Sequence, residues 1–71
     1  MALIAVSSKA ISAVEYHEKS KNLDIYFTNG DRRTYHKVPK TVYNQFMEAG
    51  SQGQYFNYNI RNKYSHSDIS N

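Results

Sequence analysis

Residues 23–28 (LDIYFT) alternate between apolar and polar side chains, and Asn29-Gly30 follows them directly. Alternation with a period of two is typical of a β-strand that buries one face. Asn-Gly favours a tight hairpin, because a type I′ turn needs positive φ at both of its central residues. The sequence therefore predicts an antiparallel hairpin whose second strand covers residues 32–38.

The length of the turn decides which side chains share a face of this hairpin. A two-residue turn places Tyr26 opposite Arg33 and Tyr35 opposite Asp24, on the face away from the apolar residues of the first strand. A bulge in the turn would shift this register. With the plain turn, we expect two tyrosines, an arginine and an aspartate to share the outer face.

The segments on either side of the hairpin predict a third strand and a helix. Residues 11–17 alternate loosely and are expected to form a strand that precedes the hairpin. Val38-Pro39 ends the sheet, because proline suits the start of a helix better than a central strand. Residues 40–49 carry apolar side chains at helical spacing, and Gly50 is a fitting C-terminal stop.

A second helix is predicted to begin at Ser51, which forms a possible capping box with Gln54. Two stripes of side chains run along it. The stripe with a spacing of four residues is interpreted as core: Phe56, Ile60 and Tyr64. The stripe with a spacing of three residues is expected on another side of the helix: Tyr55, Tyr58 and Arg61.

This order of elements predicts an α+β fold, a three-stranded antiparallel β-meander followed by two α-helices packed on one face. Residues 1–71 are expected to form a single domain, with a core over residues 6–66. Residues 67–71 continue a polar, unpatterned segment and are expected to fray.

The small size of the chain favours self-association. A domain of 71 residues with no cysteine has little core and no disulfide to stabilise it. We therefore expect a homo-oligomer, with the apolar residues 1–6 pairing with the sheet edge of a second copy. The same residues are too few for a signal peptide or a membrane span, so a soluble, cytoplasmic protein without membrane contact is expected.

Many residues follow the order of one known family: Ser7-Ser8, Ile11, Val14, Tyr16, Leu23-x-Ile25-x-Phe27-x-x-Gly30, Tyr35-x-x-Val38-Pro39, Tyr43, Ala49-x-Ser51-x-Gly53-x-Tyr55-Phe56-Asn57, Ile60-Arg61 and Tyr64. In this order the chain resembles the KTSC domain over roughly residues 6–66. That module is named for the C-terminus of some lysyl-tRNA synthetases and also occurs as small bacterial and phage proteins. The resemblance implies a fold and a link to RNA, but no catalytic residues. The family's central Tyr-x-Tyr is Arg33-x-Tyr35 here, which removes one aromatic ring from that pair.

Neither catalysis nor a metal is expected. The sequence contains no nucleophile elbow and no phosphate-binding loop. The three histidines, His17, His36 and His66, stand far apart and lack the spacing of metal ligands. His36 is interpreted as a solvent-facing strand residue rather than an acid–base group. The chain is therefore predicted to be non-enzymatic and to need no cofactor.

Two groups of aromatic and basic residues predict a binding surface. Arginine pairs with phosphate through two hydrogen bonds, and a tyrosine ring offers a face on which a base can stack. An edge strand that is kept soluble by charge is the structural alternative for the first group. The predicted ligand-binding residues are Tyr26, Arg33, Tyr35 and Lys37 on the hairpin and Tyr55, Asn57, Tyr58 and Arg61 on the second helix.

The charge balance limits the size of the expected ligand. Nine Lys and Arg against six Asp and Glu give a net charge of +3. Proteins that hold long nucleic acids often neutralise about 6–10 phosphates, more than this chain can align. We therefore expect a homo-oligomer that sequesters a short phosphorylated signal, such as a cyclic di- or trinucleotide. Two alternatives stay open: a module that binds tRNA or short single-stranded RNA, and a phage protein that docks on a host protein through tyrosine and arginine hot spots.

Overall fold

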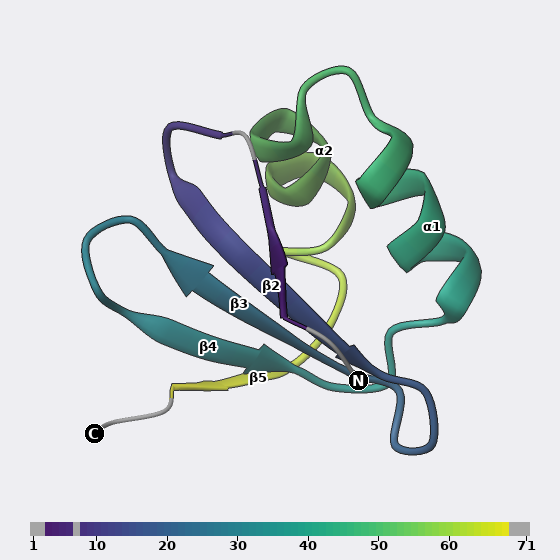
Figure 1. The fold of residues 1–71 in the computed structure, drawn as a ribbon. Helices are drawn as coiled ribbons and strands as arrows, with labels where there is room; N and C mark the ends of the chain where they lie inside the picture. Colours follow the sequence, from purple (N-terminus) through teal and green to yellow (C-terminus); the bar gives the residue numbers. More distant parts are fainter. Residues whose placement is uncertain (1–2, 7, 69–71) are drawn as a thin grey trace.

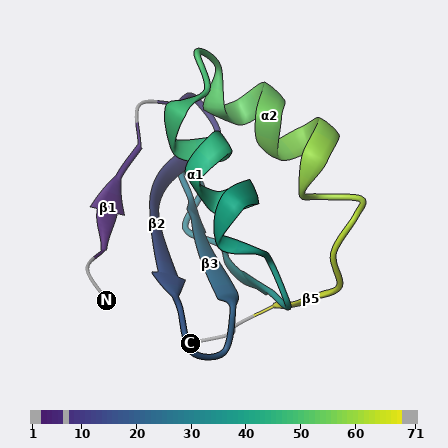
Figure 2. The same cartoon turned by 90° about the vertical axis from the view of Figure 1, so that its right-hand side faces the viewer.

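The computed structural model describes residues 3–6 and 8–68. Five antiparallel strands form one sheet, in the spatial order β1-β2-β3-β4-β5 (Figure 1). The two helices, α1 and α2, lie on the same side of the sheet (Figure 2). The strands are β1 (Ile4–Ala5), β2 (Ile11–His17), β3 (Asn22–Phe27), β4 (Arg32–Tyr35) and β5 (His66–Asp68), and the helices are α1 (Lys40–Glu48) and α2 (Gln52–Asn59).

The α+β class is confirmed, but the sheet has five strands instead of the three that were predicted. The central strands β2, β3 and β4 are the predicted meander. Short edge strands are added on both sides: β1 pairs with β2, and β5 pairs with β4. Ser67 and Asp68, which were expected to fray, belong to β5, because backbone pairing with β4 orders this segment without any apolar residue. Residues 69–71 lie outside the described residues.

The hairpin between β3 and β4 has a longer turn than the type I′ turn that was predicted. The Phe27 N–H donates to the Asp31 carbonyl at 2.9 Å, and the Gly30 N–H donates to the Phe27 carbonyl at 3.1 Å. Within this turn Gly30 alone has positive φ, at 98°. Three residues therefore connect the strands, which is the geometry of a turn followed by a glycine bulge.

This extra residue moves the register of the hairpin by one position. Tyr26 lies opposite Arg32 instead of Arg33, and Tyr35 lies opposite Leu23 instead of Asp24. Because side chains alternate along a strand, Arg33 and Tyr35 share the helix-covered face with the apolar residues of β3. The prediction that Tyr26, Arg33 and Tyr35 lie together on the outer face is wrong.

The ends of both helices fit local sequence signals. Pro39 is the N-cap of α1, and its carbonyl accepts from the next turn. That helix ends at Glu48 and has Ala49, in an extended conformation, as its C-cap, one residue before the predicted stop at Gly50. The Ser51 hydroxyl caps α2 by accepting from the Gln54 N–H at 3.4 Å, which confirms the predicted start of this helix. Neither helix in the described part of the chain is long and apolar enough to cross a membrane.

The core fills the space between the sheet and the helices. The predicted stripe on α2 is confirmed for Phe56 and Ile60, which are 4% and 0% exposed, while Tyr64 is half-buried against the core. The buried apolar residues are Val6, Ile11, Val14, Tyr16, Leu23, Ile25, Tyr35, Val38, Phe46, Phe56 and Ile60.

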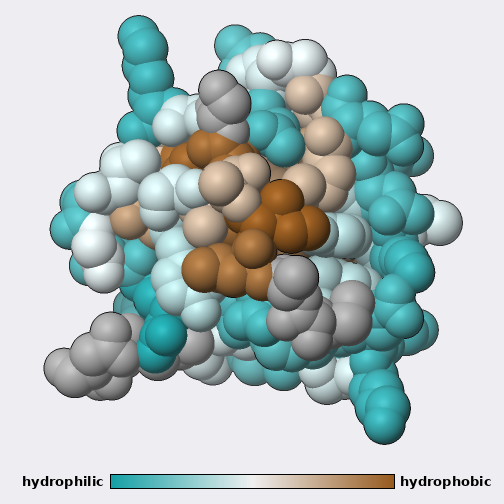
Figure 3. All heavy atoms as spheres, in the orientation of Figure 1, coloured by the Kyte–Doolittle hydropathy of each residue, from teal (hydrophilic) through white to brown (hydrophobic). Residues whose placement is uncertain are grey.

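The predicted strand in the leader is present, but it pairs with the chain's own sheet. Ile4 lies opposite Val14, and Ala5 lies opposite Ala13. Leu3 and Ile4 nevertheless remain 57% and 39% exposed. An apolar patch surrounded by polar surface occupies the face of the molecule on which β1 lies (Figure 3). Coverage of this patch by a second copy stays a prediction.

Gly30→Ala should lower the free energy of unfolding by about 1–2 kcal/mol, because an L-residue rarely adopts positive φ. A Cβ at Gly30 would meet no heavy atom within 4 Å, so the loss would come from the backbone alone. Gly50→Ala is the matched control, since its Cβ also meets nothing and its φ is not positive. Urea unfolding of both variants compares them directly. Equal stability of the two would contradict the glycine bulge.

Phe56→Ala should lower the free energy of unfolding by about 3–5 kcal/mol, because it removes a buried aromatic ring. That loss is most of the stability of a small domain. Thermal unfolding followed by circular dichroism measures it. Tyr58→Ala on the same helix is the control, because Tyr58 is 75% exposed and should change stability little. A near-normal melting temperature for Phe56→Ala would mean that the helix faces are assigned wrongly.

Candidate ligand-binding pocket between the sheet and helix α2

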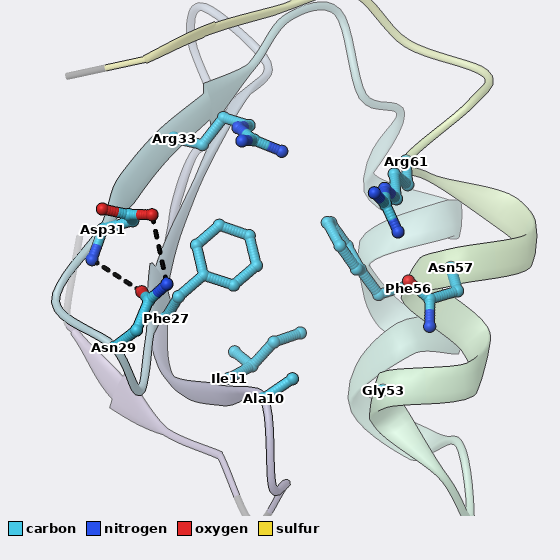
Figure 4. A pocket seen from close by; sticks show the side chains of 10 residues that line it. All are labelled: Ala10, Ile11, Phe27, Asn29, Asp31, Arg33, Gly53, Phe56, Asn57 and Arg61. Carbon is cyan, nitrogen blue, oxygen red and sulfur yellow. Dashed lines mark hydrogen bonds between the residues drawn. The ribbon is translucent and has the colours of Figure 1, made fainter.

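An open pocket of about 340 Å³ lies between the β3–β4 hairpin and α2 (Figure 4). Its walls come from three parts of the chain that are distant in sequence: the segment leading into β2, the hairpin, and the helix with the turn that follows it. The lining residues are Ala10, Ile11, Phe27, Asn29, Asp31, Arg33, Gly53, Phe56, Asn57 and Arg61.

Aromatic rings form the apolar part of the pocket. Phe27 from β3 and Phe56 from α2 meet edge to face, with ring centroids 5.9 Å apart and an angle of 67° between the rings. Tyr35 supports Phe56 from within the core, at 5.3 Å and 84°. Such edge-to-face contacts fix ring orientation and add about 0.5–1.5 kcal/mol each to simple burial. The apolar wall is therefore held in place before any ligand arrives.

Arg33 brings a guanidinium to this wall. Its Nε donates to Asp68 Oδ1 at 2.7 Å, and one terminal nitrogen lies 3.4 Å from the Tyr35 hydroxyl. The guanidinium also lies over the Phe27 ring, 5.5 Å from its centroid. The Tyr35 hydroxyl and, next, the Asp68 carboxylate raise the pKa of Arg33, so this group keeps its charge. Its side chain is 27% exposed, and one side of the fork faces the pocket (Figure 4).

A second guanidinium and an amide reach the pocket from α2 and the turn after it. Asn57 and Arg61 are four residues apart, and both are exposed at the pocket (Figure 4). The Arg61 backbone N–H donates to the Phe56 carbonyl at 2.9 Å, which places this residue one turn beyond Asn57. This side of the pocket thus adds one cation and one neutral hydrogen-bonding group to Arg33 and the aromatic rings.

The tip of the hairpin closes one side of the pocket with polar groups. The Asn29 side chain accepts from the Asp31 N–H at 2.9 Å and donates to the Asp31 carboxylate at 3.2 Å. These bonds hold the Asp31 carboxylate at the rim. A negative charge at this rim would repel a phosphate on that side, so a phosphate would be directed toward Arg33 and Arg61.

Three of the eight predicted ligand residues line this pocket: Arg33, Asn57 and Arg61. Three hairpin residues were predicted beside Arg33 and lie elsewhere. Tyr35 is fully buried beneath the pocket and touches Arg33 from below. Tyr26 is on the opposite face of the sheet, under the Arg32 guanidinium at 5.4 Å. Lys37 is exposed in the loop after β4, toward the other end of the sheet.

The two predicted tyrosines of α2 also point away from the pocket. The Tyr55 ring packs near Phe46 of α1, and its hydroxyl donates to Gln45 Oε1 at 2.8 Å. Burial raises the pKa of Tyr55, as expected for a hydroxyl at a helix–helix contact. Tyr58 is 75% exposed and makes no part of the pocket wall.

Two aromatic residues that line the pocket, Phe27 and Phe56, lie on element faces that were predicted to be buried. Both are partly or largely buried, so that interpretation is correct, but their edges also form the pocket wall. Apolar periodicity cannot distinguish a ring that is covered on all sides from one that borders a hollow. Asp31 also lines the pocket and was not predicted as a site residue.

On the outer face of the sheet, Glu15, His17 and Asp24 bring possible metal-ligand atoms within 4.8 Å of one another. The spacing of the histidines along the chain gives no sign of this group, because two of its three members are carboxylates. His17 Nε2 lies 3.0 Å from Asp24 Oδ2, and the Thr34 hydroxyl donates to Asp24 Oδ1 at 2.7 Å. Both oxygens of Asp24 already have partners within the sheet, so the group is accounted for as a polar cross-strand network.

Comparisons with known proteins agree on one family. The profile of the KTSC domain matches residues 7–64. A crystal structure of a KTSC domain protein from Yersinia pestis superimposes with a TM-score of 0.90 and 30% sequence identity, over 97% of each chain. The chain is 32% identical over 68 residues to the lysine–tRNA ligase of Nostoc punctiforme, and 31% identical to that of a second Nostoc strain. These matches cover 96% of this chain but only 12% of each ligase.

Asp68→Asn should lower the free energy of unfolding by less than about 1 kcal/mol, because its carboxylate is 74% exposed to water. The substitution removes the ion pair but keeps the backbone pairing of β5 with Arg33. Urea unfolding gives the stability, and NMR of the Arg33 Nε–H reports its changed surroundings. A loss above about 2 kcal/mol would mean that this single ion pair holds β5 to the sheet.

Proposed function

The chain belongs to the KTSC domain family, and we propose that it binds single-stranded RNA without catalysing a reaction on it. In this proposal one nucleotide occupies the pocket between the hairpin and α2. Its phosphate lies between Arg33 and Arg61, and its base contacts the edges of Phe27 and Phe56. Asn57 offers both a donor and an acceptor to the edge of the base.

The observation that carries the proposal is the presence of two arginines beside one aromatic wall. Guanidinium groups bind phosphate through paired hydrogen bonds, and aromatic side chains hold bases in single strands. Asp68 occupies Arg33 Nε but is itself exposed, so an incoming phosphate can replace it at low cost.

The size of the pocket supports a single nucleotide rather than a longer segment. Its volume of about 340 Å³ is at the lower end of the range for small-molecule sites, about 300–1,000 Å³. Its open shape leaves room for a strand to continue on either side. A pocket of this kind would hold one base of a longer strand and leave its neighbours outside.

The similarity to one segment of lysine–tRNA ligases favours RNA over a free nucleotide. This chain spans about an eighth of those enzymes, so the similarity supports a shared module and carries none of their activity over.

A free short nucleotide is the second candidate. Two arginines match the two phosphates of a cyclic dinucleotide, and a homo-oligomer could sequester such a ligand, or a cyclic trinucleotide, between copies. The exposed Leu3 and Ile4 are the observation that favours an oligomer.

Arg61→Gln should weaken binding of a fluorescein-labelled single-stranded RNA at least several-fold, because it removes one of the two phosphate partners. Arg32→Gln is the matched control. It removes one positive charge, as Arg61→Gln does, but Arg32 lies on the face of the sheet away from the pocket, paired with Tyr26 of the neighbouring strand. Fluorescence anisotropy measures both affinities, and thermal unfolding checks that each variant is folded. Equal losses in the two variants would point to non-specific attraction and contradict the pocket.

The same proteins titrated with a panel of free cyclic and linear nucleotides separate the two candidates. If the RNA proposal holds, free nucleotides bind weakly, at the pocket, as seen by NMR shifts of the Phe27 and Asn57 amides. Strong stabilisation by one cyclic nucleotide, together with a larger mass in native mass spectrometry, would favour sequestration instead. A protein that binds neither class of ligand would contradict both.

A further inference from the structure

We propose that four lysines at the end of the molecule away from the pocket form a second contact surface for the backbone of the same RNA strand. We call this group the lysine pole: Lys19, Lys21, Lys37 and Lys40. All four are exposed. The inference rests on the proposed RNA-binding function and adds a place where phosphates outside the pocket are held.

Two loops bring these lysines together. Lys19 and Lys21 belong to the turn between β2 and β3, Lys37 belongs to the loop that follows β4, and Lys40 is the first residue of α1. The Val38 N–H donates to the Lys21 carbonyl at 2.8 Å, which ties the two loops side by side. Lys40 Nζ donates to the Glu18 carboxylate, which links α1 to the same turn. Figure 1 shows both loops at one end of the sheet.

The lysine pole accounts for the whole net charge of the chain. Four lysines and Glu18 give 4 − 1 = +3, which equals the formal net charge of the protein. The other five cations, Lys9, Arg32, Arg33, Arg61 and Lys63, are balanced by five acids, Glu15, Asp24, Asp31, Glu48 and Asp68. The excess positive charge is therefore gathered at one end and is not spread evenly. A surface of this kind attracts a polyanion at a defined place.

Two of the four lysines occupy backbone positions that lysine adopts at a cost. Lys21 has φ of 62° and Lys37 has φ of 57°, and these are the two non-glycine residues with positive φ in the described part of the chain. Glycine or asparagine would adopt this conformation more easily. Charge for solubility could be placed anywhere on the surface. Lysine at two unfavourable and neighbouring positions points to a use for charge at this end, since such strain tends to gather at functional sites.

The lysine pole and the pocket are too far apart to hold one nucleotide together. The pocket lies at the end of β3 that carries Phe27 and the tip of the hairpin, whereas Lys21 directly precedes the start of β3. Six strand residues separate them, which is on the order of 20 Å. A free nucleotide can therefore reach only one of the two, and a strand of several nucleotides can reach both.

The test compares Lys21→Gln, Lys37→Gln and the double variant with Lys63→Gln. Lys63 is also exposed but lies after α2, outside the lysine pole and the pocket. The probe is a fluorescein-labelled single-stranded RNA of about 12 nucleotides, within the usual site size of such binders. Its affinity is measured over a series of salt concentrations. The logarithm of the binding constant is plotted against the logarithm of the salt concentration. Each single lysine substitution should make the slope of this plot shallower by about 0.7, and the double variant should make it shallower by about 1.4. Lys63→Gln should leave the slope unchanged.

A second experiment distinguishes failure of the lysine pole from failure of the proposed RNA-binding function. Adenosine monophosphate titrated into the double variant should shift the pocket amides as it does in the wild-type protein, because the pocket is intact. Arg61→Gln should weaken both the mononucleotide and the RNA. Loss of RNA binding in Arg61→Gln, with a wild-type slope in the double variant, would overturn the lysine pole and leave the pocket standing. No RNA binding by the wild-type protein would overturn both.

The double variant with Lys21→Gly and Lys37→Gly is a control for the possibility that the glutamine variants lose RNA binding because they fold poorly. Glycine relieves the positive φ at both positions, so the melting temperature should not fall, while the salt slope should become shallower as in the glutamine variants. A folded double glycine variant that binds the RNA with the wild-type slope would contradict the proposal.

Discussion

The three-residue turn that joins β3 to β4 is the constraint on which the rest of the site depends. Its two backbone hydrogen bonds, from Phe27 to Asp31 and from Gly30 to Phe27, set the register of the hairpin. With one residue fewer in the turn, Arg33 would point away from the helices and the pocket would have a single arginine. With the observed turn, Arg33 lies on the inner face opposite Ile25, above the buried Tyr35. A charged side chain is tolerated there because Asp68 from β5 pairs with it at the edge of the sheet. Turn geometry, core packing and the candidate site are thus parts of one arrangement.

Local signals in the sequence were sufficient for the central strands, both helices and most of the core. Alternation predicted β2 and β3, and the spacing of Phe56 and Ile60 predicted the buried side of α2. The edge strand β5 could not be predicted in this way, and neither could the pairing of β1 with the chain's own β2. Strand β5 contains only polar residues and is held by pairing with β4, a long-range interaction that leaves no periodic pattern in the sequence. The hairpin register was missed because Asn-Gly is compatible with more than one turn, and a change of one residue reverses every face assignment.

Most of the seven tyrosines, four of which were predicted to bind a ligand, have a structural role. Tyr16 donates a hydrogen bond to the Val38 carbonyl at 2.7 Å and stacks on Tyr43, with ring centroids 4.6 Å apart. Tyr35 supports Phe56, and Tyr55 joins the two helices. In a domain with so little core, tyrosine supplies a large apolar body and a hydroxyl that reaches a backbone or side-chain partner. The aromatic rings that border the pocket are those of two phenylalanines, Phe27 and Phe56.

The charges around the pocket limit how much the pocket alone can contribute to the affinity for RNA. Arg33 shares its charge with Asp68, and Asp31 stands at the rim, so the field inside the pocket is weaker than that of two unpaired guanidinium groups. Such a pocket can select a nucleotide by shape and hydrogen bonding but supplies little long-range attraction. The surplus charge of the chain lies at the lysine pole, about the length of a strand away. Phosphate contacts there would raise affinity without regard to sequence, while the pocket would discriminate between bases. If the two functions are divided in this way, affinity should depend steeply on salt and on the length of the strand, whereas preference for a base should depend on neither.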